Sequence, residues 1–402
     1  MRKFKLSSGL NIMVEKRSSK SVVLAMQVNI GSIHESDNNR GISHFIEHML
    51  FEGTKTRDAH DIANEIEKVG GEINAFTSHD RTLYYVIVPK KHFPQALSII
   101  SDIIQNPKFD PESIEKERKV ILDEVNLTQD DPKFYQFVFF LRNLYKSSQL
   151  KHPLYGYKET ITNISKEDIM QYYSRHYVLS NMALAIIGNV NIDEKMLENA
   201  FNNLNPDEHE KISLIQEPAS SSPEKFIESR SILQSYLVFG YKAPKRNSDE
   251  SYAADVIRAM LARGQSSRLF NELRTKRGLC YFVGGIYEAS KNYGYFAIYV
   301  GTDKSNIDEV IRIIKQELDS LKSATNDEIS EAKNFIEGSF MIEDEDPKKL
   351  ADTLLFWNSI NENSSIKNYI KGIKKVKKKG IAAMLKNYFN ENHLVAIISQ
   401  EK

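Results

Sequence analysis

An internal repeat constrains this 402-residue chain more than any other feature of its sequence. The segment that begins at Ile161 resembles the segment that begins at Ile373, and the numbers of matching apolar residues differ by 212 throughout. The matching positions are Ile161, Ile164, Ile169, Tyr177 and Ile186, which correspond to Ile373, Val376, Ile381, Phe389 and Ile398. Because the chain is long enough for two ordinary domains, the repeat predicts two domains of similar structure.

Two further matches occur in the same order along the chain. Residues 64–70 (NEIEKVG) and 271–278 (NELRTKRG) each have the pattern of a helix that ends at glycine. A run rich in Tyr, Val and Ile follows each of them, at residues 82–88 and 294–300, as expected of strands. We therefore predict an α+β fold with two homologous domains, each a mostly antiparallel sheet with helices packed on one face.

The stretch 217–224 (EPASSSPE) is the only Pro/Ser-rich segment of any length in the sequence. This composition is typical of a linker between domains. We therefore expect a first domain at residues 1–216, a linker at 217–224 and a second domain at 225–402.

Composition limits the classes of function. Lys+Arg and Asp+Glu both number 54, so the formal net charge is zero, and no long basic stripe points to nucleic acid. The single cysteine, Cys280, cannot form an intrachain disulfide, and the first residues lack an apolar signal-peptide core. No apolar run approaches the roughly 18 to 20 residues that span a bilayer. We expect a soluble, cytoplasmic protein without nucleic-acid or membrane partners.

The strongest chemical signal is the segment HFIEH at residues 44–48, in an apolar stretch that we expect to be helical. At about 100° per residue, His44 and His48 share one helix face, and Glu47 lies beside them. A lone histidine on such a face is more often a core residue, but two with an acid between them are costly to bury unless they are paired or bind a metal. Zinc accepts imidazole ligands, and the pattern H-x-x-E-H occurs in metallopeptidases.

A third ligand must come from elsewhere, because a catalytic zinc keeps three protein ligands and one open position. The strongly helical run at residues 112–126 contains several acids. Glu117 and Glu124 lie seven residues apart and share one helix face. The pattern alone does not choose between these two carboxylates.

With these motifs the chain resembles the pitrilysin family of inverted zinc peptidases, which includes insulin-degrading enzyme and mitochondrial processing peptidase. The segments HFIEHMLFEGT, ERKVILDEV and HPLYG carry the resemblance, which runs through nearly the whole chain. It implies one zinc ion per chain, held by His44, His48 and Glu124, with Glu124 seventy-six positions beyond the second histidine. It also implies that Glu47 is the general base and that Glu117 is an accessory catalytic acid.

The resemblance extends to the substrate contacts. Asn74 and Ala75 precede the run TLYYVIV, where an exposed edge strand could pair with an extended peptide, and the alternative is a plain hairpin. The family places residues like Arg274 and Tyr281 against the substrate backbone and the oxyanion, and the alternative is a surface Arg and a core Tyr. The helix expected near residues 253–261 has no histidine, so we expect no metal site in the second domain.

These features predict a zinc metalloendopeptidase that acts on peptides or on unfolded or precursor segments. Larger relatives hold four such domains in one chain, so we expect a homodimer or a heterodimer with a related chain, in which Arg274 and Tyr281 can serve the partner's zinc site. One alternative is a non-catalytic structural or regulatory subunit of a processing-peptidase-like complex, although such relatives usually lose a metal-site residue. Another is an iron oxygenase with two histidines and one carboxylate.

Overall fold

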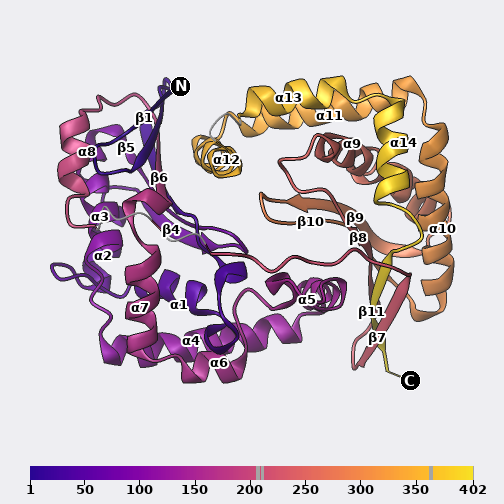
Figure 1. Cartoon of the computed structure of the whole chain (residues 1–402), viewed down its shortest axis with the longest axis horizontal. Helices are drawn as coiled ribbons and strands as arrows, with labels where there is room; N and C mark the ends of the chain where they lie inside the picture. Colours follow the sequence, from indigo (N-terminus) through magenta and orange to yellow (C-terminus); the bar gives the residue numbers. More distant parts are fainter. Residues whose placement is uncertain (205–208, 210–211, 362–364, 402) are drawn as a thin grey trace. The chain divides into compact units, whose positions relative to one another are not determined.

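The computed structural model describes residues 1–204, 209, 212–361 and 365–401 (Figure 1). The chain divides into two compact units, and neither is one continuous stretch of sequence. The first unit consists of Met1–Leu127, His152–Leu214 and Glu343–Ser359, and the second of Thr128–Lys151, Ile215–Ile342 and Ile360–Lys402. Each unit is built around one sheet.

The first unit contains a six-stranded sheet with the strand order β1-β2-β6-β3-β5-β4. Neighbouring strands are antiparallel except β2 and β6, which are parallel. The central strands β3 and β5 are rich in Val, Leu, Tyr and Ile and are buried along most of their length, as expected where helices cover a sheet. The strands are β1 (Arg2–Lys5), β2 (Asn11–Glu15), β3 (Ser21–Val28), β4 (Glu72–Thr77), β5 (Thr82–Pro89) and β6 (Met182–Ile187).

The second unit contains a five-stranded sheet with the order β7-β11-β8-β10-β9, and β7 and β11 form its one parallel pair. Apart from β1, the strand order and the place of the parallel pair are the same as in the first sheet. The predicted α+β fold with two similar, mostly antiparallel sheets is therefore confirmed. The strands are β7 (Glu224–Arg230), β8 (Ser235–Lys242), β9 (Cys280–Ala289), β10 (Gly294–Thr302) and β11 (Leu394–Gln400).

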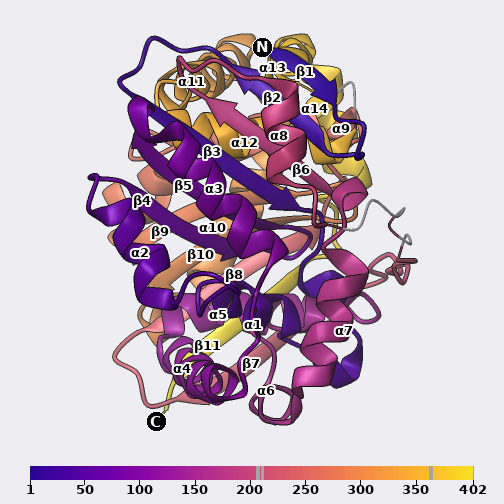
Figure 2. The same ribbon diagram turned by 90° about the vertical axis from the view of Figure 1, so that its left-hand side faces the viewer.

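Helices of the first unit form its core with the sheet. Helix α3 lies against β3 and β5, and its apolar stripe, which includes Ile99, Ile100 and Ile103, is fully buried (Figure 2). The helices are α1 (Ile42–Met49), α2 (Ala59–Glu67), α3 (Phe93–Gln105), α4 (Pro111–Asp130), α6 (Lys158–Asn163), α7 (Lys166–His176), α8 (Glu194–Ala200) and α12 (Pro347–Ile360).

The second unit repeats this arrangement around its own sheet. In both units a long helix follows the hairpin of the sheet, α3 after β5 and α10 after β10, and a second long helix comes next, α4 or α11. A π-helical turn at Phe270–Thr275 precedes β9. The helices are α5 (Pro132–Leu144), α9 (Glu250–Ala262), α10 (Ile307–Ser320), α11 (Asn326–Glu343), α13 (Ile366–Lys375) and α14 (Lys378–Asn387). In the described part of the chain, no helix combines the length and the apolar composition needed to cross a membrane.

One helix from each half of the repeat packs on the sheet of the other half. Helix α12 adds a second helical layer to the first sheet, where Gln27 Nε2 donates a hydrogen bond to Leu355 O at 3.5 Å. Helix α5 packs on β8 and β11, and Gly240 is needed there because a Cβ would lie 2.6 Å from Phe140 Cζ. The predicted division at residues 216 and 225 stays a prediction about the repeat, and each compact unit also contains one helix from beyond that division.

The predicted linker belongs to the second unit by its contacts. Residues 217–223 form neither helix nor strand. The Glu217 carboxylate accepts hydrogen bonds from the backbone N–H groups of Lys146, Ser147 and Ser148, and it pairs with Lys242 at 2.6 Å. The segment is therefore fixed at its first residue.

Candidate metal centre

Helix α1 carries both histidines of the HFIEH segment. It follows Gly41, which has a φ of 92° and accepts a hydrogen bond from Phe45 N at 2.9 Å. A Cβ at Gly41 would lie 2.6 Å from Tyr155 O, so both the backbone angle and the close approach require glycine. Phe45 is fully buried, and this turns His44 and His48 toward the less buried side of the helix. The expected helix with both histidines on one face is present.

A buried carboxylate fixes the start of α1. Glu35 accepts hydrogen bonds from Gly41 N at 2.8 Å and from Ser43 N at 2.9 Å, and only 2% of the residue is exposed. Burial raises the pKa of its carboxyl group to about 7, although the two N–H donors act in the opposite direction. Because a helix leaves its first N–H groups unpaired, these contacts hold the turn that carries His44.

Helix α4 brings two carboxylates to these histidines. His48 Nδ1 lies 2.9 Å from an oxygen of Glu117. An oxygen of Glu124 lies 3.6 Å from His44 Nε2 and 3.6 Å from His48 Nε2. Glu124 therefore faces both rings, whereas Glu117 contacts the outer nitrogen of one ring.

Arg118 fixes α4 beside α1. The residue is only 9% exposed, and its guanidinium donates to Ile161 O and, at 2.8 Å, to Ile164 O. Its Cζ also lies 5.4 Å from the ring centre of Phe45 in α1. These contacts position the helix turn on which Glu117 lies.

The donor set suits zinc. One ligand atom from each of His44, His48 and Glu124 can be chosen so that all three lie within 4.8 Å of one another. Two imidazole nitrogens and one carboxylate oxygen match the three protein ligands of a catalytic zinc site. Within residues 1–204, 209, 212–361 and 365–401, no other group of His, Cys, Asp and Glu side chains has this spacing. The residues present therefore fit the ion.

The cluster formed by His44, Glu47, His48, Glu117 and Glu124 has charges that favour a cation. Burial lowers the pKa of His48, but the hydrogen bond with Glu117 and the nearby carboxylate of Glu124 outweigh burial and raise it to about 9. The interaction with His48 in turn lowers the pKa of both carboxyl groups. Burial and the charge of His48 lower the pKa of His44 to about 4. The two carboxylates thus stabilise positive charge at this place, and a divalent cation would experience the same field.

Glu47 lies next to the donor set, and β4 orients it. Thr77, the last residue of β4, donates a hydrogen bond from Oγ1 to Glu47 Oε2 at 2.5 Å. Burial raises the pKa of the Glu47 carboxyl group, whereas the Thr77 hydrogen bond and His48 lower it. A carboxylate with a raised pKa beside a metal-type donor set is suited to accept a proton.

Strand β4 forms one edge of the first sheet, because β5 is its only neighbouring strand in the described chain. In the register with β5, Asn74 lies opposite Tyr85, and Ala75 lies opposite Tyr84. The Asn74 side-chain oxygen accepts a hydrogen bond from Ala75 N at 2.8 Å. The expected edge strand is present, while substrate binding by Asn74 and Ala75 stays a prediction.

Arg274 and Tyr281 belong to the second unit, whereas the cluster lies in the first. Arg274 lies in the π-helical turn, and its Cζ is 5.2 Å from the ring centre of Phe270. Tyr281 lies near the start of β9, is 55% exposed and donates a hydrogen bond to Asp303 at 3.0 Å. It is therefore not a core residue, and the substrate roles of both side chains stay predictions.

Sequence reasoning missed three supporting residues, namely Glu35, Thr77 and Arg118. Arg118 had a usable signal, because it lies four residues after Ile114 and three before Ile121 on the apolar face of α4. A charged residue on such a face needs a partner. Glu35 and Thr77 carried no such signal in the sequence, because neither lies on the apolar face of a predicted helix.

The fold and the site define a two-unit α+β protein with a donor set of the zinc-peptidase type. Residues 11–158 match the family model described as insulinase (peptidase family M16), and residues 163–336 match the one described as peptidase M16 inactive domain. A Rickettsia felis protein named "uncharacterized zinc protease" is 33% identical over 333 residues, which cover 81% of this chain and 79% of that protein. The chain therefore belongs to the M16, or pitrilysin, family of peptidases.

Other similar proteins agree with this assignment. The Bacillus subtilis "uncharacterized zinc protease YmxG" is 26% identical over 408 residues, covering 99% of this chain and 98% of that protein. A solved structure of a protease from Helicobacter pylori has a TM-score of 0.91 at 19% identity and covers 100% of this chain and 99% of its own. The peptidase M16 inactive domain from Pseudomonas fluorescens has a TM-score of 0.91 at 17% identity, with coverages of 100% and 98%. These two structures support the fold alone.

Proposed function

We propose that the protein is a zinc metalloendopeptidase that hydrolyses peptide bonds in peptides or in unfolded or precursor segments. One observation carries the proposal: ligand atoms of His44, His48 and Glu124 lie within 4.8 Å of one another, directly beside Glu47. The zinc-protease names of the relatives support it. One such group in the described residues corresponds to one zinc ion per chain.

The proposed chemistry divides among the residues of the cluster. Zinc, when bound by His44, His48 and Glu124, supplies a Lewis acid that acidifies water and polarises the scissile carbonyl. Glu47 accepts the proton of the attacking water and delivers it to the leaving amine, a role that contributes roughly 10² to 10⁴ in rate. Glu117 acts through His48, because its contact with Nδ1 leaves the Nε2 lone pair for the metal.

The proposed substrate is an extended peptide that adds to the edge of the first sheet. The open edge of β4 can bind a chain of any sequence, and the Ala75 N–H group, now bonded to the Asn74 side chain, becomes available when that side chain turns away. Arg274 and Tyr281 would bind the substrate backbone and the tetrahedral oxyanion. Tyr281 is exposed, so its side chain is accessible to a substrate.

The test is cleavage of a quenched fluorescent peptide library by the wild type and by Glu47→Gln, with the zinc content of both measured. We expect the variant to hold about one zinc per chain and to cleave at least about 10²-fold more slowly. Glu67→Gln, at an exposed position of α2, is the matched control and should behave as the wild type. A zinc-loaded wild type that cleaves nothing would instead support the non-catalytic subunit.

One observation favours that alternative for part of the chain. Residues 163–336 match the inactive-domain model, and α9 contains no histidine. All residues of the cluster, however, lie within the segment 11–158 that matches the insulinase model. The observation therefore argues against chemistry in the second half and not against chemistry in the first.

We further propose that the active form is a homodimer or a heterodimer with a related chain. The proposal rests on where the residues lie, since Arg274 and Tyr281 belong to one unit and the metal-type cluster belongs to the other. Mixing Glu47→Gln with Arg274→Ala tests it. Activity above the sum of the separate proteins means that Arg274 serves a partner's site, whereas simple addition means that it serves its own.

A further inference from the structure

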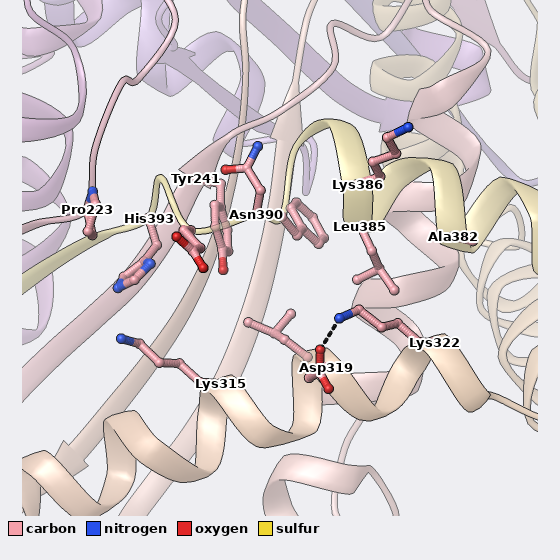
Figure 3. A pocket seen from close by; sticks show the side chains of 13 residues that line it. Pro223, Tyr241, Lys315, Asp319, Lys322, Ala382, Leu385, Lys386, Asn390 and His393 are labelled. Carbon is pink, nitrogen blue, oxygen red and sulfur yellow. Dashed lines mark hydrogen bonds and ion pairs between the residues drawn. The ribbon is translucent and has the colours of Figure 1, made fainter.

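The second unit contains a pocket of about 840 Å³ that the proposed peptidase chemistry does not use (Figure 3). It lies between α10 and α14, beside the end of β8 and the turn before β11. Its volume falls in the range of roughly 300 to 1,000 Å³ that is typical of small-molecule sites. The pocket is therefore large enough to hold a small molecule.

The equivalent place in the first unit, between α3 and α7, is filled. There the Tyr173 hydroxyl donates to Ile104 O at 2.6 Å. The Tyr173 ring stacks on Tyr177 at 4.9 Å and meets Phe109 edge-on at 5.2 Å. By the constant difference of 212, Leu385 stands where the first unit has Tyr173. Leu385, which has no ring, lines the pocket at this position.

The hydroxyl of a buried tyrosine points into this space. Tyr241 is 3% exposed and stacks on Phe389 with ring centres 5.0 Å apart. Figure 3 shows its hydroxyl directed toward the middle of the pocket, and it has no hydrogen-bond partner in the part of the chain that the structure describes. Burial raises the pKa of this hydroxyl, so it remains a donor. The hydroxyl faces the open space of the pocket, so a ligand that enters can accept its hydrogen bond in place of water.

The charged groups around the pocket leave an excess of positive charge. Asp319 is neutralised by Lys322, with which it forms an ion pair. Lys315 of α10 and Lys386 of α14 have no ion-pair partner among the described residues. These two cations outnumber the remaining carboxylate in the lining, Glu391. The pocket thus combines apolar walls, one unpaired donor and a net positive rim.

We propose that this pocket binds an apolar carboxylate, a ligand with an aromatic or aliphatic body and one anionic end. The body packs on Leu318, Leu385 and Phe389, which are all buried against the second core. The carboxylate accepts the hydrogen bond of the Tyr241 hydroxyl and lies near the charge of Lys315. The C-terminal end of a peptide and a free carboxylic acid share this chemistry.

The test is isothermal titration calorimetry of the zinc-loaded protein with N-acetyl-phenylalanine, decanoate and N-acetyl-phenylalanine amide. The first probe mimics a peptide end, the second is a free acid, and the third lacks the negative charge. We expect at least one carboxylate to bind, and the amide to bind about tenfold more weakly. Binding of the first probe alone identifies peptide ends as the source, and binding of decanoate alone identifies free acids. Equal binding of the amide, or no binding of either carboxylate at millimolar concentration, overturns the proposal.

Variants locate the binding. Tyr241→Phe should weaken it about tenfold, Lys315→Gln about threefold, and Leu385→Tyr should abolish it by restoring the ring that the first unit has. Lys245→Gln, an exposed position outside the pocket, is the matched control and should change nothing. If Leu385→Tyr has an unchanged unfolding midpoint and still binds the carboxylate, the proposed binding site is wrong. If that variant does not fold, unchanged binding by Tyr241→Phe leads to the same conclusion.

Discussion

Apart from β1, the two sheets have the same strand order. Helix α1, which follows β3, and helix α9, which follows β8, differ in their polar residues. When the Met-Leu pairs at the ends of α1 and α9 are aligned, the cluster residues of α1 meet different residues in α9. The corresponding pairs are His44 and Asp255, Glu47 and Arg258, and His48 and Ala259. Asp255 is buried and pairs with Arg246 at 2.5 Å. The second unit thus has a buried ion pair at the place where the first unit has its metal-type cluster.

Helices α4 and α11 show the same contrast. When their buried isoleucines are aligned, Glu117 and Glu124 meet Ala332 and Ser339. Arg118 meets Lys333, whose amine donates to a backbone oxygen at 3.2 Å much as Arg118 does. Apolar positions and helix contacts thus maintain the duplicated scaffold, while a few polar substitutions decide where chemistry is possible.

The largest effect should come from removing the carboxylate that faces both histidines. Glu124→Gln is expected to lower zinc content below one per chain and to slow peptide cleavage about 10³-fold, since a bound metal supplies several kcal/mol of transition-state stabilisation. Zinc analysis and a peptide assay measure both effects. Glu112→Gln, exposed in the first turn of α4, is the control. Retained zinc in Glu124→Gln together with lost zinc in Glu117→Gln would reverse the assignment of the third ligand.

The ion pair of the second unit should matter for stability and not for zinc. Asp255→Asn leaves the Arg246 charge buried without its partner, so the free energy of unfolding should fall by about 3 to 5 kcal/mol. Urea denaturation measures this, and zinc content should not change. Asp308→Asn removes an exposed pair with Lys225 and should cost less than about 1 kcal/mol. Loss of zinc in folded Asp255→Asn would contradict the division of roles.

Exchanging the residues at the filled and open positions should give unequal results. Tyr173→Leu removes a packed ring and the hydrogen bond to Ile104 O, and should lower the free energy of unfolding by roughly 2 kcal/mol. Leu385→Tyr places a ring in an existing space and should change it by less than about 1 kcal/mol. Thermal unfolding of both variants measures the contrast. Equal destabilisation would mean that the pocket cannot accept a ring.

Acid should weaken the first unit through the partly buried His34 and the buried His176. Burial lowers the pKa of His34 to about 4 and of His176 to about 3. Unfolded histidine titrates near pH 6.5, so below that pH the unfolded chain binds protons that the folded chain does not. This stability is fully present above pH 6.5 and is lost as the pH falls toward 4, with at most roughly 2 kcal/mol per histidine at pH 5.

Urea denaturation at pH 7 and pH 5 measures this loss. His176→Gln should reduce the difference between the two conditions, whereas His60→Gln, at an exposed position, should leave it as in the wild type. An identical pH dependence in all three proteins would show that other groups cause the acid sensitivity.

The repeat and the HFIEH segment were sufficient to predict the fold class and most of the candidate cluster. His44, Glu47 and His48 could be placed on one side of a helix because helical spacing depends only on neighbouring residues. The choice between Glu117 and Glu124 was different, since both lie on one face of α4. It needed the family resemblance, and the structure adds the 3.6 Å distances from Glu124 to both Nε2 atoms.

The two-fold repeat, the metal-type helix and the lack of histidine in α9 can be read from the amino-acid order, because they depend on residue identity and spacing along the chain. The support that Glu35, Thr77 and Arg118 give to the cluster becomes visible only in the folded chain. The same holds for the packing of α5 and α12 on the sheet of the other half, and for the pocket beside Leu385, where the first unit has the packed ring of Tyr173. The physical reason is that each of these features depends on contacts between residues far apart in the sequence, which no local pattern records.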